Sequence, residues 1–196
     1  ISAQSDSDVL LEQIRAKEAE IKKLETDLGK YKSAFFKTQE QSKTLKNQIA
    51  LIEAQINKLG IDLKITQAKI SKTETNVRLY SGKIKEKELK IKERQTAISK
   101  SVRFLAYSDN QGFLSILFQS RKLSDFFRQS DYLINLEGGL YANLQSLAQD
   151  KKELEDLLSG QKEFKNELDA LRKELQAKNK LVQNQKKEKN ELLKET

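Results

Sequence analysis

The chain carries a hydrophobic residue at almost every seventh position through its first half. Fourteen positions with this spacing run from Ile14 to Leu105, and all but Ser42 are apolar. A companion position, three residues further along, is apolar at Leu24, Tyr31, Leu45, Ile52, Leu59 and Tyr80. A mean spacing of 3.5 residues over this many turns is typical of a left-handed coiled coil. The pattern predicts one helix from about Asp8 to Ala106, roughly 150 Å long.

A break and a second helical arm follow. Residues 106–112 read AYSDNQG and gather residue types that end helices. A second break is predicted at residues 119–125, with Ser124 capping the next helix. Beyond it, an apolar stripe recurs at Leu140, Leu147, Leu154, Leu168, Leu175 and Val182. With no later turn signal, the chain is expected to double back on itself.

The predicted fold class is therefore all-α, a long antiparallel coiled-coil helical hairpin with short helices at the tip. Its parts are a first arm over residues 1–106, a tip over residues 107–130 and a return arm over residues 131–196. Because the return arm is the shorter one, residues 1–40 should overhang it. The overhang keeps its apolar stripe and needs a partner. The partner is expected to be a second copy of the chain, so that the chain self-associates there, with sequence beyond residue 196 as the alternative.

The positive charge is concentrated in one stretch. The net charge is +8, and residues 64–103 hold twelve basic and four acidic residues. The second seam position is also polar there, at Thr66, Thr73, Lys87, Arg94 and Ser101. We expect ion pairs with the acidic residues of the opposite arm, which are Glu153, Glu155, Asp156, Glu163, Glu167 and Asp169. Contact with a polyanion is the alternative. Nucleic acid is disfavoured because Tyr80 is the only aromatic residue of the basic stretch.

The composition argues against catalysis and against a membrane span. The chain has no His and no Cys, which removes the usual nucleophile–base pairs and zinc ligands. It shows no phosphate-binding glycine loop, so no metal, cofactor or enzymatic activity is expected. It also lacks a run of about 18 apolar residues, so it is not expected to span a membrane.

Aromatic residues cluster at the predicted tip. Eight of the thirteen Phe and Tyr residues lie between Phe104 and Tyr141. A turn between two arms needs only a few polar residues. Short helices are predicted at residues 113–119 and from Ser124, and they cannot bury every apolar group in this stretch. Some of them should fill a small core at the end of the hairpin. The others should remain exposed as an interaction surface.

The same stretch resembles the tip of a known family. The matching residues are Arg103, Tyr107, Phe113-Leu114, Leu117-Phe118, Ser120, Ser124-Asp125-Phe126-Phe127 and Tyr132-Leu133. They are similar to the tip motif of murein hydrolase activators and cell-wall hydrolases of the EnvC and PcsB kind. In these proteins an N-terminal coiled-coil hairpin precedes a hydrolase or activator domain, often of the LytM type. Such a domain would lie beyond residue 196, because its His or Cys ligands are not found in this chain.

The resemblance implies a function as well as a fold. It implies a bacterial, extracytoplasmic regulatory arm that is recruited by the extracellular domain of FtsX, next to the membrane, to control cell-wall cleavage during division. By this analogy the partner-binding residues are Phe113, Leu114, Leu117, Phe118, Leu123, Phe126 and Phe127. The alternative hypothesis is a structural spacer or a holdase-like coiled coil that clasps apolar client segments.

Overall fold

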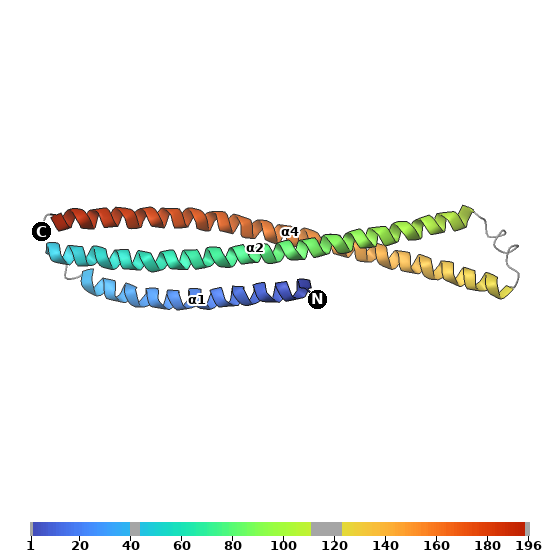
Figure 1. Ribbon diagram of the computed structural model, residues 1–196, viewed down its shortest axis with the longest axis horizontal. Helices are drawn as coiled ribbons and strands as arrows, with labels where there is room; N and C mark the ends of the chain where they lie inside the picture. The colour runs from blue at the N-terminus through green and yellow to red at the C-terminus, as the bar shows by residue number, and fades with distance from the viewer. Residues whose placement is uncertain (1, 40–43, 111–122, 195–196) are drawn as a thin grey trace. The chain divides into compact units, whose positions relative to one another are not determined.

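The computed structural model of the chain describes residues 2–39, 44–110 and 123–194. These residues form three helices, which are α1 (Ser2–Gln39), α2 (Leu45–Asn110) and α4 (Leu123–Lys194) (Figure 1). No strand occurs within the described ranges. The prediction of an all-α fold is confirmed.

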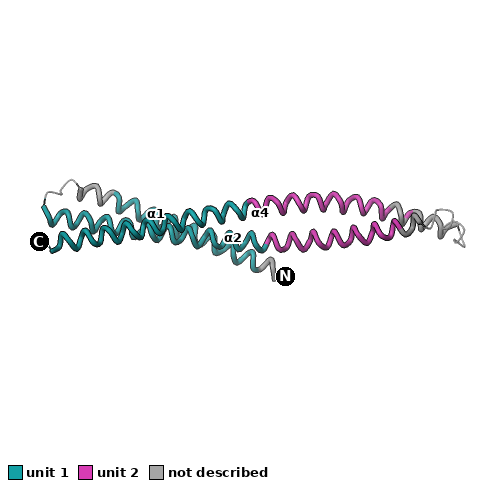
Figure 2. The backbone as a smooth tube through the Cα atoms, turned by 90° about the horizontal axis from the view of Figure 1, so that it is seen from above, with its two compact units in different colours: residues 1–82, 160–196 teal, residues 83–159 magenta. Residues whose placement is uncertain are grey.

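The chain divides into two units, each of which is described by itself. Unit 1 contains residues 1–82 and 160–196, and unit 2 contains residues 83–159 (Figure 2). Helices α2 and α4 each contribute one segment to unit 1 and one segment to unit 2. Helix α1 belongs to unit 1 alone.

In unit 1, α2 and α4 run antiparallel to each other. Three side-chain contacts define the pairing, Glu53 with Lys189 (2.7 Å), Thr66 with Lys178 (3.0 Å) and Glu74 with Arg172 (2.9 Å). The residue number rises along α2 while that of the partner falls along α4. The predicted seam residues Thr66 and Thr73 are buried, at 1% and 2% exposure, as are Leu168 and Leu171 of α4.

The first arm is not one helix, and this prediction is wrong. Helix α1 ends at Gln39 and α2 begins at Leu45. Residues 1–40 do not overhang the return arm, because α1 lies along the side of α2 (Figure 1). Glu18 of α1 pairs with Lys72 at 2.8 Å, and Glu25 pairs with Lys69 at 3.8 Å. The order of these pairs shows that α1 is antiparallel to α2.

A second apolar stripe on α2 explains why α1 folds back. Ile65, Ala68, Thr75 and Leu79 are all buried, at 4–7% exposure. Their spacing of three, seven and four residues places them on the same helical face as Lys72, away from the seam with α4. Lys72 is the residue that pairs with Glu18 of α1. We infer that this stripe faces α1. The seven-residue pattern of the main seam conceals it in the sequence.

The start of α2 is marked only by a weak signal. The backbone amides of Asn47 and Gln48 donate hydrogen bonds to the Thr44 carbonyl, at 2.9 and 3.0 Å. The Asn47 amide also lies 3.4 Å from Thr44 Oγ1, which places Thr44 as the N-terminal cap. Threonine is common elsewhere in this chain, and no Gly or Pro lies between residues 30 and 59. A turn at this point therefore could not be distinguished from continued helix.

Tyr80 of α2 packs so closely against α4 that position 160 has no room for a side chain. The Tyr80 ring meets Phe164 edge-on at 5.2 Å between ring centroids. A Cβ atom at Gly160 would lie only 2.6 Å from Tyr80 Cε1, whereas a Cβ atom at Gly82 would meet nothing within 4 Å. Gly160 therefore lets the aromatic ring approach the backbone of the opposite helix.

These two glycines form a matched pair for a stability experiment. Gly82→Ala should raise the free energy of unfolding by up to about 1 kcal/mol, because alanine is the better helix former. Gly160→Ala brings the same propensity gain but forces the Tyr80 ring to move, so it should be less stable than Gly82→Ala by about 1–3 kcal/mol. Urea unfolding followed by circular dichroism measures both changes. Equal stabilisation by the two alanines would contradict the packing described for Tyr80.

In unit 2, α2 and α4 are again antiparallel, because Lys87 of α2 pairs with Glu153 of α4 while Arg94, further along α2, pairs with Asp150, which comes earlier in α4. The predicted seam residues Ile84 and Ile91 are buried, each at 8% exposure. Helix α4 passes through Gly138 and Gly139 without interruption. Its first residue is Leu123, so Ser124 is not the cap, and the short helix predicted from Ser124 is the beginning of α4.

Candidate functional site

The predicted partner-binding residues lie mostly outside the described part of the chain. Phe113, Leu114, Leu117 and Phe118 fall between α2 and α4, outside the described residues. The short helix predicted at residues 113–119 falls there too. Leu123, Phe126 and Phe127 belong to the first turns of α4, but their side chains are not among those described.

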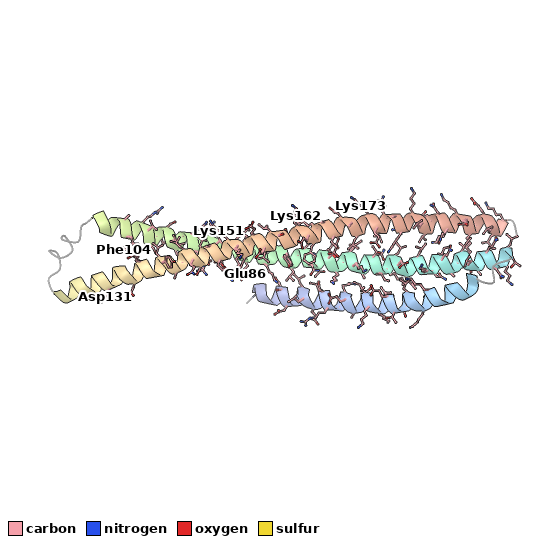
Figure 3. All side chains as sticks on the ribbon, turned by 180° about the vertical axis from the view of Figure 1, so that it is seen from behind. Glu86, Phe104, Asp131, Lys151, Lys162 and Lys173 are labelled. Carbon is pink, nitrogen blue, oxygen red and sulfur yellow. The ribbon has the colours of Figure 1, made fainter. Side chains whose placement is uncertain are left out.

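The described helices nevertheless give the positions of the two helix ends on either side of residues 111–122. Antiparallel pairing in unit 2 brings the last turns of α2 and the first turns of α4 to the same end of that unit. Phe104 of α2 and Asp131 of α4 lie toward this end (Figure 3). Residues 111–122 therefore connect two helix ends that lie at one end of unit 2.

Exposed apolar side chains are found on the helices that lead to this end. Val102 and Phe104 of α2 are 48% and 43% exposed, and Tyr141 and Leu144 of α4 are 73% and 47% exposed. Two paired helices offer a narrow seam, so residues away from the seam keep much of their surface in contact with solvent. Exposed aromatic and aliphatic groups of this kind are typical of surfaces that contact another molecule.

Charged residues occupy the second seam position in the middle of unit 2, beside the apolar residues Ile84 and Ile91. The Lys87 amine lies 3.0 Å from Asp150 Oδ1 and 2.6 Å from Glu153 Oε2. Arg94 Nε lies 2.6 Å from Asp150 Oδ2. Asp150 therefore accepts one hydrogen bond on each carboxylate oxygen. The four residues form a continuous ionic cluster that joins the two helices.

The ionic cluster shifts the acid–base equilibria of its members. Hydrogen bonds from Lys87, and then from Arg94, hold the pKa of Asp150 below its usual range. The bond from Lys87 also lowers the pKa of Glu153, and the two carboxylates, Glu153 first, raise the pKa of Lys87. Asp150 is only 7% exposed. Because only two described helices surround it, water stays close, and burial raises its pKa by less than the ion pairs lower it.

Unit 1 contains a smaller polar group at the equivalent seam position. Thr66 donates a hydrogen bond to the Asp62 carbonyl at 3.0 Å and lies 3.3 Å from Glu174 Oε1. Lys178 donates to Thr66 Oγ1 at 3.0 Å and pairs with Glu174 at 2.6 Å. The bond from Lys178 holds the pKa of Glu174 below its usual value. The seam thus satisfies its buried hydroxyl without a buried free charge.

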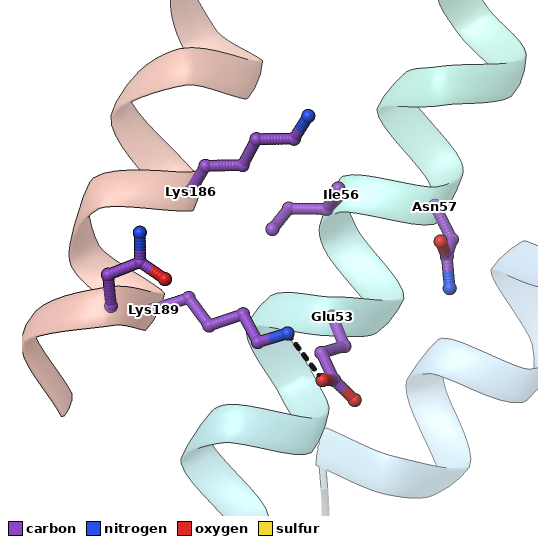
Figure 4. Close-up of a pocket in the computed structure, with 6 residues that line it drawn as sticks. Glu53, Ile56, Asn57, Lys186 and Lys189 are labelled. Atoms are coloured by element: carbon purple, nitrogen blue, oxygen red, sulfur yellow. Dashed lines mark ion pairs between the residues drawn. The ribbon is translucent and has the colours of Figure 1, made fainter. Parts of the chain in front are cut away.

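Two hollows on the described surface are open to solvent. One hollow of about 470 Å³ lies in unit 1, open to solvent and lined by Glu53, Ile56, Asn57, Lys186, Lys189 and Asn190. The Glu53–Lys189 ion pair crosses it (Figure 4). Within the described ranges, no group of three or more His, Cys, Asp or Glu side chains could hold a metal ion. No helical stretch there combines the length and apolar character that crossing a membrane requires.

The sequence located part of the ionic cluster and missed the rest. Lys87 and Arg94 were predicted at the polar seam position, and Glu153 was predicted to pair with the basic stretch. Among the six acidic residues proposed for this role, only Glu153 pairs with that stretch in the described chain. Asp150 was not predicted. It shares a seven-residue register with Leu157, Phe164 and Leu171, and that register could have placed it in the seam.

Lys69 and Lys72 of the basic stretch pair with α1 rather than with α4, because α1 folds back.

No protein-family model, no curated protein and no solved structure matches the chain.

Proposed function

We propose that the chain is a regulatory and partner-docking arm, without catalytic activity, of a peptidoglycan hydrolase or hydrolase activator. In this proposal α2 and α4 form a coiled-coil hairpin with short helices at its tip, and the tip binds the extracellular domain of FtsX. The FtsE–FtsX complex would recruit the arm and control cell-wall cleavage during division. The arm would act outside the bacterial cytoplasm, next to the membrane, without a metal or cofactor of its own.

The observation that carries the proposal is the position of the aromatic segment. Residues 113–127 hold four of the eight Phe residues of the chain. The segment includes the residues that follow the end of α2 and the first residues of α4, and these two antiparallel helix ends lie at the same end of unit 2. The exposed side chains of Val102 and Tyr141 lie on the helices that lead to it. Apolar groups at the end of a helix pair suit a protein-binding surface.

The proposed contact residues are Phe113, Leu114, Leu117, Phe118, Leu123, Phe126 and Phe127. The resemblance to the EnvC and PcsB tip motif supports them, and their apolar character matches a protein-binding surface. A nucleic-acid role has less support, because five basic residues of the positive stretch pair with carboxylates, and these are Lys69, Lys72, Lys87, Lys90 and Arg94.

A double substitution tests the proposed docking. Leu117→Glu with Phe118→Glu places two charges in the apolar segment and should weaken binding to the FtsX extracellular domain at least 100-fold, about 3 kcal/mol, because hot-spot residues carry most of the affinity. Isothermal calorimetry measures the affinity, and circular dichroism checks that the helices remain.

Leu89→Glu with Leu158→Glu is the matched control. Both leucines lie in unit 2 away from the tip and are exposed, at 54% and 48%. The control should bind as the unaltered chain does. Equal affinity of the tip variant and the control would contradict the proposed docking site. A chain that binds no FtsX domain but prevents aggregation of unrelated unfolded proteins would favour the holdase hypothesis.

A further inference from the structure

Helix α2 has two separate binding faces in unit 1. One face, with Thr66 and Thr73, meets α4, and the other, with Ile65, Ala68 and Leu79, meets α1. The second face also presents Lys72, and Lys69 beside it, to Glu18 and Glu25. It is thus an apolar stripe with basic residues, and it accepts an amphipathic helix with matching acidic residues.

Helix α1 contributes only partly buried side chains to its contact with this face. None of its described side chains is buried, and its stripe residues Ile14, Ile21, Leu24 and Leu28 remain half-buried. Its two ion pairs with α2 are open to solvent on the α1 side, while Lys72 is half-buried, and the Glu25–Lys69 pair is long, at 3.8 Å. Exposed ion pairs contribute little. The fully buried side chains of this interface belong to α2, and they stay covered only while a copy of α1 occupies the face.

The sequence between α1 and α2 is equally suited to a straight helix. The seven-residue apolar register of α1 continues into α2 without a shift, through Phe35, Ser42 and Ile49. Residues 30–59 contain neither Gly nor Pro. A turn between two helices usually contains Gly or Pro, and it does not require the seven-residue apolar spacing to continue from one helix into the next. Only the Thr44 cap favours the folded-back form within the described residues.

We propose that α1 exchanges between two copies of the chain. In the exchanged dimer, α1 and α2 of each copy form one continuous helix, and α1 of each copy occupies the second face of α2 in the other. The same contacts form in both states, including the Glu18–Lys72 pair, so the balance depends on the junction and on protein concentration. This inference does not depend on the proposed function.

The absence of cysteine allows a direct test. Two single variants, Glu18→Cys and Lys72→Cys, are mixed, unfolded and refolded together at high concentration, and treated with a short bismaleimide. A covalent product that joins the two different variants forms through exchange. It should appear on a denaturing gel at twice the mass of the chain. Glu18→Cys mixed with Lys92→Cys is the matched control, because Lys92 is exposed and belongs to unit 2, and it should give little of this product.

Substitutions at the junction should move the balance. Ser42→Ala with Thr44→Ala removes the cap of the folded-back monomer and favours continuous helix. Two unaltered monomers give up two caps when they form one exchanged dimer, and the variant has no such loss, so its dimer fraction should be about tenfold higher. Ser42→Gly with Lys43→Gly should lower it. Light scattering measures the mass of each variant. A chain that stays monomeric with alanines at the junction, and that gives no mixed product above the control, would overturn the proposal.

Discussion

Replacing Asp150 with asparagine should destabilise unit 2 more than any other single charge removal in the described chain. The carboxylate of Asp150 accepts hydrogen bonds from both Lys87 and Arg94, and the residue is 7% exposed. Asparagine keeps the shape but has no charge, and it leaves Arg94 without a carboxylate in this cluster. Loss of one partner from a buried ionic group is costly because the other charges stay in place. The thermal midpoint should fall by about 5 °C or more.

Asp156→Asn is the control for this result. Asp156 lies on the same helix, is exposed and makes no ion pair with a described residue. The control should leave the thermal midpoint within about 1 °C of the unaltered chain, as exposed substitutions usually do. Hydrogen exchange should show the loss of protection near residues 84–98 and 147–157. Equal midpoints for the two variants would mean that the ionic cluster contributes nothing to stability.

The same variant has a defined effect on the pH dependence of stability. The folded-state pKa values of Asp150 and Glu153 are lowered by Lys87. A lowered pKa contributes stability that is fully present above the ordinary carboxyl range, about pH 4, and is lost as pH falls through the folded-state values. The unaltered chain should therefore lose stability on acidification. Asp150→Asn should show a smaller loss over the same range, which acid titration of the thermal midpoint can measure.

Replacing Leu79 with alanine should release α1 from α2. Leu79 is 5% exposed and lies on the same face of α2 as Ile65, Ala68 and Lys72. Truncation of a buried leucine costs about 2–4 kcal/mol. Because α1 can detach by itself, the cost should appear mainly as weaker docking of α1. Its amide hydrogens should exchange roughly thirtyfold faster, which corresponds to about 2 kcal/mol.

Leu89→Ala is the control on the same face of α2. Leu89 belongs to unit 2 and is 54% exposed. Its truncation should leave the exchange of α1 unchanged. If Leu79→Ala instead lowered the protection of α4 and left α1 unaffected, the second face of α2 would belong to the seam with α4, and the account of unit 1 would be wrong.

The apolar register made the main seam predictable but concealed the fold of unit 1. The seven-residue spacing correctly placed Ile84 and Ile91 in the seam, and it placed Lys87 and Arg94 at the polar positions. The same spacing continues through Ser42, so it predicted one helix where the chain turns back. A turn that needs no Gly or Pro leaves little trace in a sequence.

Two signals for the missed features were present in the chain. The second apolar stripe of α2 runs from Ile65 to Leu79 and stops just before Gly82. Its end indicates how far along α2 another helix could pack. Asp150 shares the register of Leu157, where a charge is unusual and calls for a partner. Both signals appear only when each helix is searched for a second set of seven-residue positions, because the main apolar stripe dominates a search for one set. The contacts of the segment between α2 and α4 could not be predicted from the sequence, because the same pattern of apolar residues fits a buried core and an exposed binding surface.

The measurement that tests the proposed docking most directly is hydrogen exchange of the intact chain with and without the FtsX extracellular domain. The account predicts slower exchange at residues 107–130 and in the neighbouring turns of α2 and α4, with α1 unchanged. Slower exchange confined to α1, or no change anywhere at saturating concentrations of the domain, would contradict it.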